Sequence, residues 1–172
     1  MILRPISMSD LDALVTLSRR AFIDAFGHLY AAEDLTAFLD TYRAPGRFAA
    51  MIEDPDATVA GAHVEGALAG YCTVQFGKGF EERSEPRPAD PAMLGQLYCS
   101  ADATGKGIGA ALLEQAIEAA RERGCDALQL SVYSENFGAQ RFYQRHGFRH
   151  VADIDFSVGS HRDEEFLYEL TP

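Results

Sequence analysis

The stretch Thr104-Gly105-Lys106-Gly107-Ile108-Gly109 decides the fold of this chain. It follows an apolar, strand-like segment at residues 93–99 and leads into a helix-like segment near Ala110. Three glycines at alternate positions let the backbone approach a ligand closely, and the start of a helix leaves amide N–H groups without partners. Such amides attract anions. The stretch therefore predicts a pyrophosphate site, to which Lys106 adds a positive charge unless it is simply solvated.

Composition and charge narrow the class of protein. The 172 residues suit one domain, 1–172, and 47% of them are hydrophobic, as expected of a water-soluble globular protein. The formal charge of −11 disfavours a nucleic-acid partner and is compatible with a cationic substrate. No segment reaches the roughly 20 apolar residues that span a membrane, and the first ten residues lack the pattern of a secretory signal. Three cysteines without metal-ligand spacing favour a cytoplasmic location and no metal site.

The periodicity of apolar residues predicts a mixed α/β arrangement without internal repeats. Ser9 is the expected N-cap of the first helix, and Gly124 follows the fourth helix as its terminator. Residues 77–91, rich in charge, Pro and Gly, are expected to form a loop. Helices are expected at residues 11–26, 32–42, 47–52, 107–123 and 137–145, and strands at 2–6, 59–63, 68–75, 93–99, 127–132, 148–156 and 164–170.

The glycine run by itself also satisfies a dinucleotide-binding pattern. Gly105, Gly107 and Ala110 match G-x-G-x-x-A between a strand and a helix. That pattern requires an acidic residue at the end of the next strand, roughly 20 residues further on. Asp126 precedes that strand and Glu135 lies beyond it, and repeated βαβ units are missing. An oxidoreductase is therefore disfavoured.

Residues 94–148 resemble the core of the GNAT acetyltransferase superfamily. In that family a strand of the type L-Y-V runs into a Q/R-x-x-G-x-G/A loop, and N-x-x-A and F-Y-x-x-x-G-F follow in order. The corresponding pieces here are L-Y-C at 97–99, T-G-K-G-I-G at 104–109, N-F-G-A at 136–139, and F-Y at 142–143 with G-F at 147–148. Four pieces in the family's order and spacing are far more specific than one glycine motif.

The resemblance implies a twisted, mixed sheet with helices on both faces, splayed at an acetyl-CoA site between strands 93–99 and 127–132. It implies transfer of an acetyl group from acetyl-CoA, a cosubstrate, to a primary amine by direct attack in a ternary complex, without a metal. The loop 104–109 would bind the pyrophosphate through backbone N–H groups. The strand before it would pair with the pantetheine arm and stabilise the developing oxyanion. The residues so implied are Leu97, Tyr98, Cys99, Thr104, Gly105, Lys106, Gly107, Ile108 and Gly109.

Two further residues carry roles that the resemblance implies. Asn136 resembles an asparagine that holds the pantetheine arm, and Tyr143 resembles the tyrosine that protonates the departing thiolate. The residues alone also allow Asn136 to be a helix cap and Tyr143 to be a core aromatic residue. Cys99 has no adjacent histidine to activate it, so strand packing is favoured over a covalent acyl-enzyme.

The chain departs from the family pattern in two places. Thr104 replaces the usual Gln or Arg that opens the loop, which removes a long side chain from the phosphate site. Met93, Gly95 and Gln96 stand where many relatives carry a glutamate that deprotonates the amine through water. The general base is therefore open, and a bound amine with a lowered pKa could dispense with one. The candidates are Tyr98, Asp90, Glu135, His28 and His161.

The acceptor is suggested by a second, less specific resemblance. Residues 17–40 and the segment F-S-V-G-S-H-R-D-E-E-F-L-Y-E-L at 156–170 are similar to bacterial PaiA-type polyamine acetyltransferases, which favours a spermidine-like amine. An acidic lining is expected from Tyr30, Glu33, Asp34, Asp40, Asp163 and Glu164, although acidic residues at a helix start also simply favour its positive end. A peptide N-terminus as acceptor and a non-catalytic acyl-CoA sensor are the alternatives. The family resemblance is compatible with a homodimer, but no periodic pattern marks an interface.

Overall fold

The computed structural model describes all residues, 1–172, and contains one sheet of seven strands in the order β1-β2-β3-β4-β5-β7-β6. The strands are β1 (Ile2–Pro5), β2 (Ala57–Val64), β3 (Ala67–Phe76), β4 (Pro91–Cys99), β5 (Ala127–Tyr133), β6 (Arg149–Val158) and β7 (His161–Leu170). The helices are α1 (Leu11–Phe26), α2 (Ala32–Tyr42), α3 (Pro45–Glu53), α4 (Ile108–Glu122) and α5 (Phe137–Arg145). All strand pairs are antiparallel except β4 with β5.

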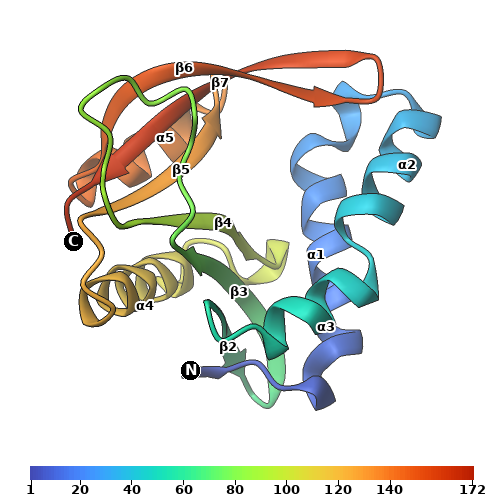
Figure 1. The fold of residues 1–172 in the computed structure, drawn as a ribbon. Coiled ribbons are helices and arrows are strands. Elements are labelled where there is room, and N and C mark those ends of the chain that lie inside the picture. Colours follow the sequence, from blue (N-terminus) through green and yellow to red (C-terminus); the bar gives the residue numbers. More distant parts are fainter.

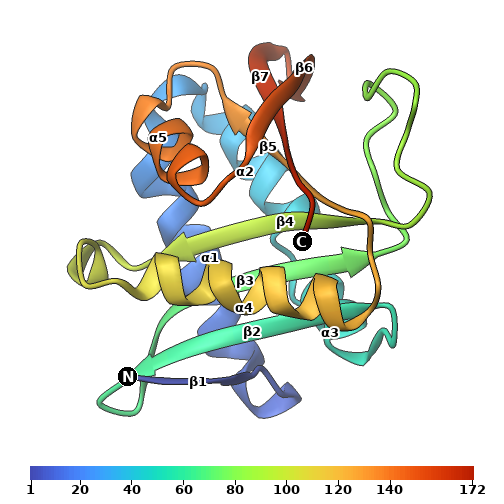
Figure 2. The same cartoon turned by 90° about the vertical axis from the view of Figure 1, so that its left-hand side faces the viewer.

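Helices cover both faces of the sheet. Figure 2 shows α4 lying across β2, β3 and β4, and in Figure 1 α1, α2 and α3 lie on the opposite side. The apolar face of α4, with Leu112 and Leu113 fully buried, packs on Val74 and Leu94 in the largest hydrophobic cluster. A second cluster joins α1 and α3 to Tyr71 on the other face. This two-sided burial fixes the sheet and confirms the predicted mixed α/β fold.

The sheet opens between β4 and β5. The two strands pair only at their starts, where 91–93 lie beside 127–129, and then separate. A cause lies in β4, where the register against β3 jumps so that Gln96 opposes Thr73 and Leu94 opposes Val74, leaving Gly95 without a partner. Such a bulge bends the strand that carries it and increases its twist. The split predicted between these two strands is thus present, with a bulge at Gly95 that the pattern of apolar residues did not predict.

The hairpin of β6 and β7 reaches from the sheet to the N-terminal helices (Figure 1). At its tip, Ser160 Oγ donates a hydrogen bond of 3.2 Å to Asp34 of α2, and Phe156 packs edge-on against Phe38. The strand β7 begins at His161, three residues before the predicted start at 164. The extension follows from pairing, because Asp163, Arg162 and His161 continue the ladder with β6 up to a tight turn.

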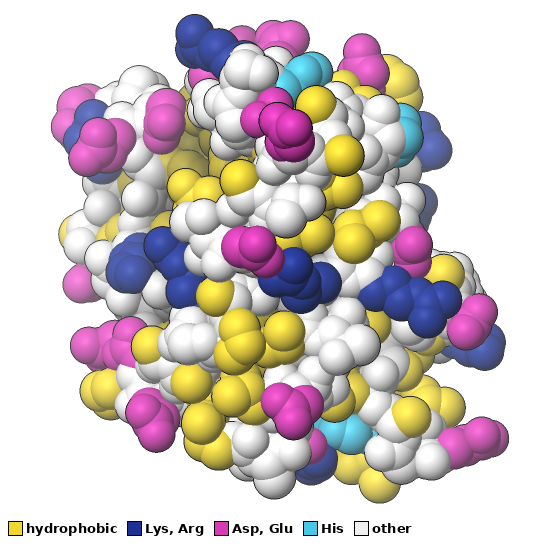
Figure 3. Space-filling view, turned by 90° about the vertical axis from the view of Figure 1, so that its right-hand side faces the viewer, with side chains coloured by type: hydrophobic (Ala, Val, Ile, Leu, Met, Phe, Trp, Pro, Cys, Tyr) yellow, Lys and Arg dark blue, Asp and Glu magenta, His cyan; other side chains and the backbone are white.

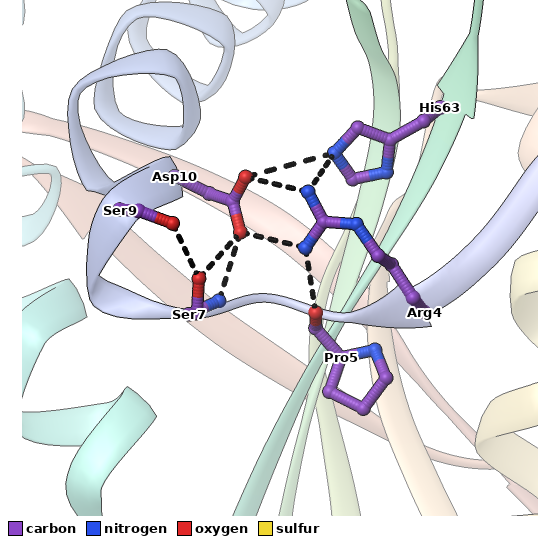
Figure 4. A network of polar contacts seen from close by, with 6 residues as sticks. All are labelled: Arg4, Pro5, Ser7, Ser9, Asp10 and His63. Atoms are coloured by element: carbon purple, nitrogen blue, oxygen red, sulfur yellow. Dashed lines mark hydrogen bonds and ion pairs between the residues drawn. The ribbon is translucent and has the colours of Figure 1, made fainter. Parts of the chain in front are cut away.

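The start of the first helix differs from the prediction. Ser9 lies inside a short 3₁₀ turn, residues 8–10, which begins with a capping box of Ser7 and Asp10, and Asp10 is the N-cap of α1. Figure 4 shows Asp10 accepting hydrogen bonds from Ser7 and from both terminal nitrogens of Arg4, at 2.8 and 2.7 Å. His63 Nε2 lies 3.0 Å from the same guanidinium. This network joins β1, the start of α1 and β2.

The outer face over α1–α3 carries acidic and basic side chains interspersed with apolar ones (Figure 3). None of the helices is both long and apolar enough to cross a membrane. No group of three or more His, Cys, Asp or Glu side chains is placed to hold a metal ion.

Candidate active site

A cavity of about 590 Å³ occupies the opening between β4 and β5. Its walls come from α1, α2, the end of β4, β5, α5 and the β6–β7 hairpin. Most of its lining is hydrophobic, and Asp24, Arg43, Asp163 and Glu165 are the charged residues among it. A mostly apolar cavity with a few charged groups is the usual form of a small-molecule site.

The structure brings most of the predicted site residues to this cavity. The lining includes Leu97, Tyr98 and Cys99 from β4, together with Thr104, Asn136 and Tyr143. Residues 105–109 lie outside the lining, at the N-terminal end of α4. Elements far apart in sequence therefore meet at one place, which the strand order explains: β4 and β5 are neighbours, and α4 and α5 follow them directly.

The glycine loop has the geometry of an anion site. Gly105 and Gly107 have φ angles of +75° and +78°, a backbone conformation that residues other than glycine rarely adopt. Nothing lies within 4 Å of where their Cβ atoms would be. No side chain caps α4, and its first helical hydrogen bond runs from Ala111 N to Gly107 O at 3.0 Å. The amides of Ile108, Gly109 and Ala110 precede that bond. They and the helix dipole favour a negatively charged group there.

The edge of β4 that faces the cavity is free. Beyond Met93 the strand has β3 on one side and no strand on the other. A strand with one unpaired edge offers backbone N–H and C=O groups to an extended ligand. Because this edge leads directly toward the glycine loop, a ligand with a phosphate end and an amide-containing arm fits the two features together.

Tyr143 lines the same opening. It is 9% exposed, and burial is the main cause that raises the pKa of its phenol, with smaller contributions from Tyr98, Cys72 and Cys99. A phenol with a raised pKa keeps its proton at neutral pH. Its ring packs against Phe142 and Phe148, so Tyr143 is a core aromatic residue that also lines the cavity, and its role as proton donor stays a prediction.

Asn136 is an observed helix cap as well as a cavity residue. Its Oδ1 accepts a hydrogen bond of 3.1 Å from the Ala139 amide, at the start of α5. Cys99 also lines the cavity, and burial raises the pKa of its thiol. A raised pKa suppresses the thiolate that covalent catalysis requires, in line with the packing role expected for Cys99.

The predicted acidic lining is only partly formed. Tyr30 and Asp163 line the cavity and are hydrogen-bonded, and His161 Nε2 lies 2.8 Å from Asp163. The other four acidic residues lie elsewhere. Glu33 is exposed, Asp34 accepts from Ser160, Asp40 pairs with Arg19 at 2.8 Å, and Glu164 faces away on β7.

Glu165 is the acidic residue that the sequence reasoning missed. Successive side chains of a strand point to opposite faces, so Glu165 shares the cavity face with Asp163 and Glu164 does not. Its Oε2 is buried without a hydrogen-bond partner. Burial raises the pKa of this carboxyl, and the nearby Ser131 hydroxyl opposes the shift while Asp163 adds to it. The alternation in 163–167 was the signal available in the sequence.

The earlier candidates for a general base are mostly placed away from the cavity. Asp90 lies beside Asp126, Glu135 accepts from Tyr133, and His28 is exposed; none of these three lines the opening. His161 is outside the lining and contacts two lining residues, Asp163 and Tyr30. Tyr98 does line it, and burial raises the pKa of its phenol, which disfavours the anionic form that a base needs.

Comparison with known proteins agrees with this geometry. The profile of the acetyltransferase (GNAT) family matches residues 12–148. The chain belongs to this family. An uncharacterized N-acetyltransferase of Mycobacterium tuberculosis is 28% identical over 160 residues, which covers 93% of this chain and 96% of that protein. The spermine/spermidine N(1)-acetyltransferase of Bacillus subtilis is 31% identical over 98 residues, covering 56% of this chain and 62% of that protein.

Solved structures share the fold of this GNAT protein. The PaiA N-acetyltransferase of Thermoplasma acidophilum, solved in complex with coenzyme A, superposes with a TM-score of 0.78 at 22% identity and covers 99% of this chain and 98% of its own. The ribosomal-protein-S18-alanine N-acetyltransferase of Escherichia coli gives a TM-score of 0.71 at 19% identity, with 99% and 92% covered. At these identities the likeness concerns the fold. The family membership carries the activity, acetyl transfer to an amine.

Proposed function

We propose that this protein transfers the acetyl group of acetyl-CoA directly to a primary amine of a small molecule. The observation that carries the proposal is the meeting, in one opened sheet, of an uncapped helix N-terminus, a free strand edge, a protonated phenol and a buried carboxyl. Each of these meets a different need of the reaction: phosphate binding, alignment of the thioester, protonation of the leaving group and removal of a proton from the amine.

The residues present fit acetyl-CoA. The amides of Gly105, Lys106, Gly107, Ile108 and Gly109 would hold the pyrophosphate, and the positive φ angles of Gly105 and Gly107 leave open space at the loop. Thr104 contributes no long side chain, and its hydroxyl donates to Ala101 O at 2.8 Å. The free edge of β4 at Leu97, Tyr98 and Cys99 would pair with the pantetheine arm, with Asn136 beside it.

Two side chains then manage the protons. Glu165 takes a proton from the amine, and the neutral nitrogen attacks the thioester carbonyl carbon. Amides on the free edge of β4 stabilise the negative charge that develops on the carbonyl oxygen. As the carbon–sulfur bond breaks, Tyr143 gives its proton to the thiolate and the nitrogen releases its remaining excess proton to solvent, leaving a neutral N-acetylated amine and free CoA thiol. Glu165 then loses its proton to solvent, and Tyr143 regains one from it.

A polyamine is a candidate acceptor on one specific observation. Three carboxylates, Asp24, Asp163 and Glu165, line the cavity against a single cation, Arg43, and a negative cavity attracts polycations. The partial match to the spermine/spermidine N(1)-acetyltransferase of Bacillus subtilis supports the same class. Arg43, the cation in the same lining, disfavours an acceptor that carries positive charges alone.

The test is acetyl-CoA-dependent thiol release against polyamines, amino acids, aminoglycosides and short peptides, with Tyr143→Phe beside the wild type. The hydroxyl of Tyr143 makes no hydrogen bond in the structure, so its removal leaves the fold intact while kcat falls by about 10²- to 10⁴-fold, the range of general acid–base catalysis. Tyr168→Phe is the matched control. It removes the hydroxyl of another buried tyrosine, one bonded to Gln144 outside the cavity, and should leave kcat unchanged.

The same assay separates the alternatives. Unchanged kcat in Tyr143→Phe would remove the assigned proton donor. Turnover of peptide N-termini alone would replace the small-molecule acceptor by a protein one. Binding of acetyl-CoA without turnover of any amine would point to an acyl-CoA sensor.

A further inference from the structure

Arg43 is a buried cation without a counter-ion. It follows α2, is 8% exposed and lines the cavity. Its Nη1 donates one long hydrogen bond of 3.3 Å to the carbonyl of Tyr42, its Nε is buried without any partner, and no salt bridge includes it. A guanidinium carries five N–H donors, and a buried charge is costly unless it is paired. Arg43 therefore holds hydrogen-bonding capacity that this chain does not use.

Aromatic rings hold the guanidinium in place. Its central carbon lies 5.4 Å from the ring centre of Phe22, 5.4 Å from that of Phe38 and 5.8 Å from that of Tyr98. Ring contacts of this kind stabilise the positive charge but satisfy none of its N–H groups. Nε has no partner, and Nη2, which lies with Nε on one edge of the guanidinium, has no carboxylate partner in this chain; such an edge can bind a carboxylate through two parallel hydrogen bonds.

The other partly buried arginines of the molecule each pair with a carboxylate. Arg4 forms a two-point contact with Asp10 at 2.7 and 2.8 Å, and Arg83 does the same with Glu169 at 2.9 and 3.2 Å. Arg19 pairs with Asp40 through one contact of 2.8 Å. These pairs show how the chain satisfies an arginine when it is structural. At Arg43 the carboxylate is missing, although the residue is more buried than any of the others.

The cavity consequently holds charges of both signs, with Arg43 as the cation and Asp24, Asp163 and Glu165 as the carboxylates. Arg43 stands beside Tyr98 at the end of β4, and Asp163 and Glu165 project from β7, with no salt bridge between the two groups. An acceptor bound between them would place its amine toward the carboxylates and a negative group toward Arg43. A polyamine has no such group and would leave the guanidinium unpaired.

We propose that Arg43 binds a carboxylate of the acceptor, so that the substrate class is a small amino acid or another amine that carries a carboxylate. The inference rests on the proposed acetyl transfer and narrows its acceptor. Arg43 thereby acts as a specificity residue that orients the acceptor, and it takes no part in moving protons.

The first test uses pairs of amines that differ only in the negative group: 4-aminobutanoate with butylamine, and β-alanine with propylamine. Putrescine is added as the diamine. The carboxylate-bearing member is expected to have at least a tenfold higher kcat/KM in every pair that is turned over, a ratio that a two-point guanidinium–carboxylate contact readily supplies. Equal or higher kcat/KM for putrescine or the simple alkylamines would overturn the proposal.

The second test uses Arg43→Gln and Arg43→Lys. Loss of the charge should abolish the preference through the KM of the acceptor and leave the KM of acetyl-CoA unchanged, while Arg43→Lys should keep part of it. An equal loss for all amines, charged and uncharged alike, would show a structural role and overturn the proposal. Acetyl-CoA binding and circular dichroism report whether each variant is folded, and the paired panel on the wild type needs no variant.

Calorimetric titration of the coenzyme A-loaded protein with the same compounds separates this inference from the proposed function. Binding of carboxylate-bearing amines that weakens in Arg43→Gln, without acetyl transfer, would support the anion site and contradict the proposed function. Acetyl transfer to amines with and without a carboxylate alike would support the proposed function and contradict the anion site. No binding preference for carboxylates would remove the inference.

Discussion

Glu165 shows how a single position on a strand acquires a chemical role. Its carboxyl lies on the cavity face of β7, its Oε2 has no partner, and burial with the nearby Asp163 raises its pKa above the ordinary 4.5. A carboxyl with a raised pKa is a stronger base once it is ionised, and it ionises at a higher pH. The position thus gains basicity at a cost in stability.

We expect Glu165→Gln to lower kcat/KM by about 10²-fold or more, the size of a general-base contribution. In the wild type, activity should rise with pH through the raised pKa of Glu165, and that acidic limb should be absent from the pH profile of the variant. The profile of kcat/KM against pH measures this. Glu164→Gln, on the opposite and exposed face of β7, is the control and should keep the wild-type profile.

The stability of the same variant provides an independent check. Because the folded-state pKa of Glu165 lies above its unfolded value, ionisation of this group weakens the folded state as the pH rises through that pKa. Glu165→Gln should therefore be at least as stable as the wild type at pH 7. A variant that is slow because it is partly unfolded would contradict the assigned role.

At the scale of elements, β4 and α4 act as one unit. The bulge at Gly95 turns β4 away from β5, and the chain then passes through two left-handed glycines into an uncapped helix. The strand supplies a free edge and the helix supplies free amides, so under the proposed function both backbones would bind ligand through groups that regular pairing would otherwise consume. A glycine-rich segment between two strongly patterned elements is suited to that proposed binding function.

Gly107→Ala tests this unit. With φ at +78° an alanine is strained, so the free energy of unfolding should fall by about 1 kcal/mol. The KM of acetyl-CoA should rise, because relief of the strain would move the loop out of the conformation in which its amides face the ligand. Gly124→Ala is closely matched, with φ at +72° and nothing within 4 Å of its Cβ, but lies after the other end of α4. It should lose similar stability with no change in KM; equal effects on KM would argue against a specific role of the loop.

The sequence predicted most elements because local pattern and tertiary structure agree there. The α4 helix, for example, has apolar residues at 108, 112, 113, 116 and 120, and all of them are buried. The glycine loop, Asn136 and Tyr143 each belong to a contiguous motif, and the structure places Asn136 and Tyr143 at the cavity, while their roles in binding and catalysis stay predictions. Glu165 and Arg43 were missed because neither has a motif, and their roles arise from which face of β7 or which end of α2 meets the cavity. Such roles depend on the assembled fold.

At the scale of the whole molecule, the N-terminal strand is attached through a charged network. Arg4 on β1, Asp10 at the start of α1 and His63 on β2 meet in one place (Figure 4), and His63 is 8% exposed. The side-chain hydrogen bond from Arg4 is the main cause that holds the pKa of Asp10 well below its ordinary 3.8. The network joins the first strand to the sheet on which α1 packs.

Asp10→Asn should therefore reduce stability in a pH-dependent way. The folded-state pKa of Asp10 is depressed, so its stabilising contribution is complete above pH 3.8 and is lost as the pH falls toward the folded-state value. At pH 7 the melting temperature should drop by about 2–4 °C, the size expected for a modest local loss in a protein of this length. Thermal melts between pH 7 and pH 2.5 should show the gap between wild type and variant narrowing below about pH 4, the ordinary carboxyl range.

The control for this measurement is Asp12→Asn, which changes an exposed carboxylate in the same turn that has no partner in the structure. It should shift the melting temperature little at any pH. We also propose that residues 1–172 form one domain, so the same melts should show a single cooperative transition. If Asp10→Asn instead produced an early, separate transition, the N-terminal strand and α1 would unfold on their own, and the network would stabilise only that part of the chain. A gap that stayed constant down to pH 2.5 would show that the charge of Asp10 is not what stabilises the fold.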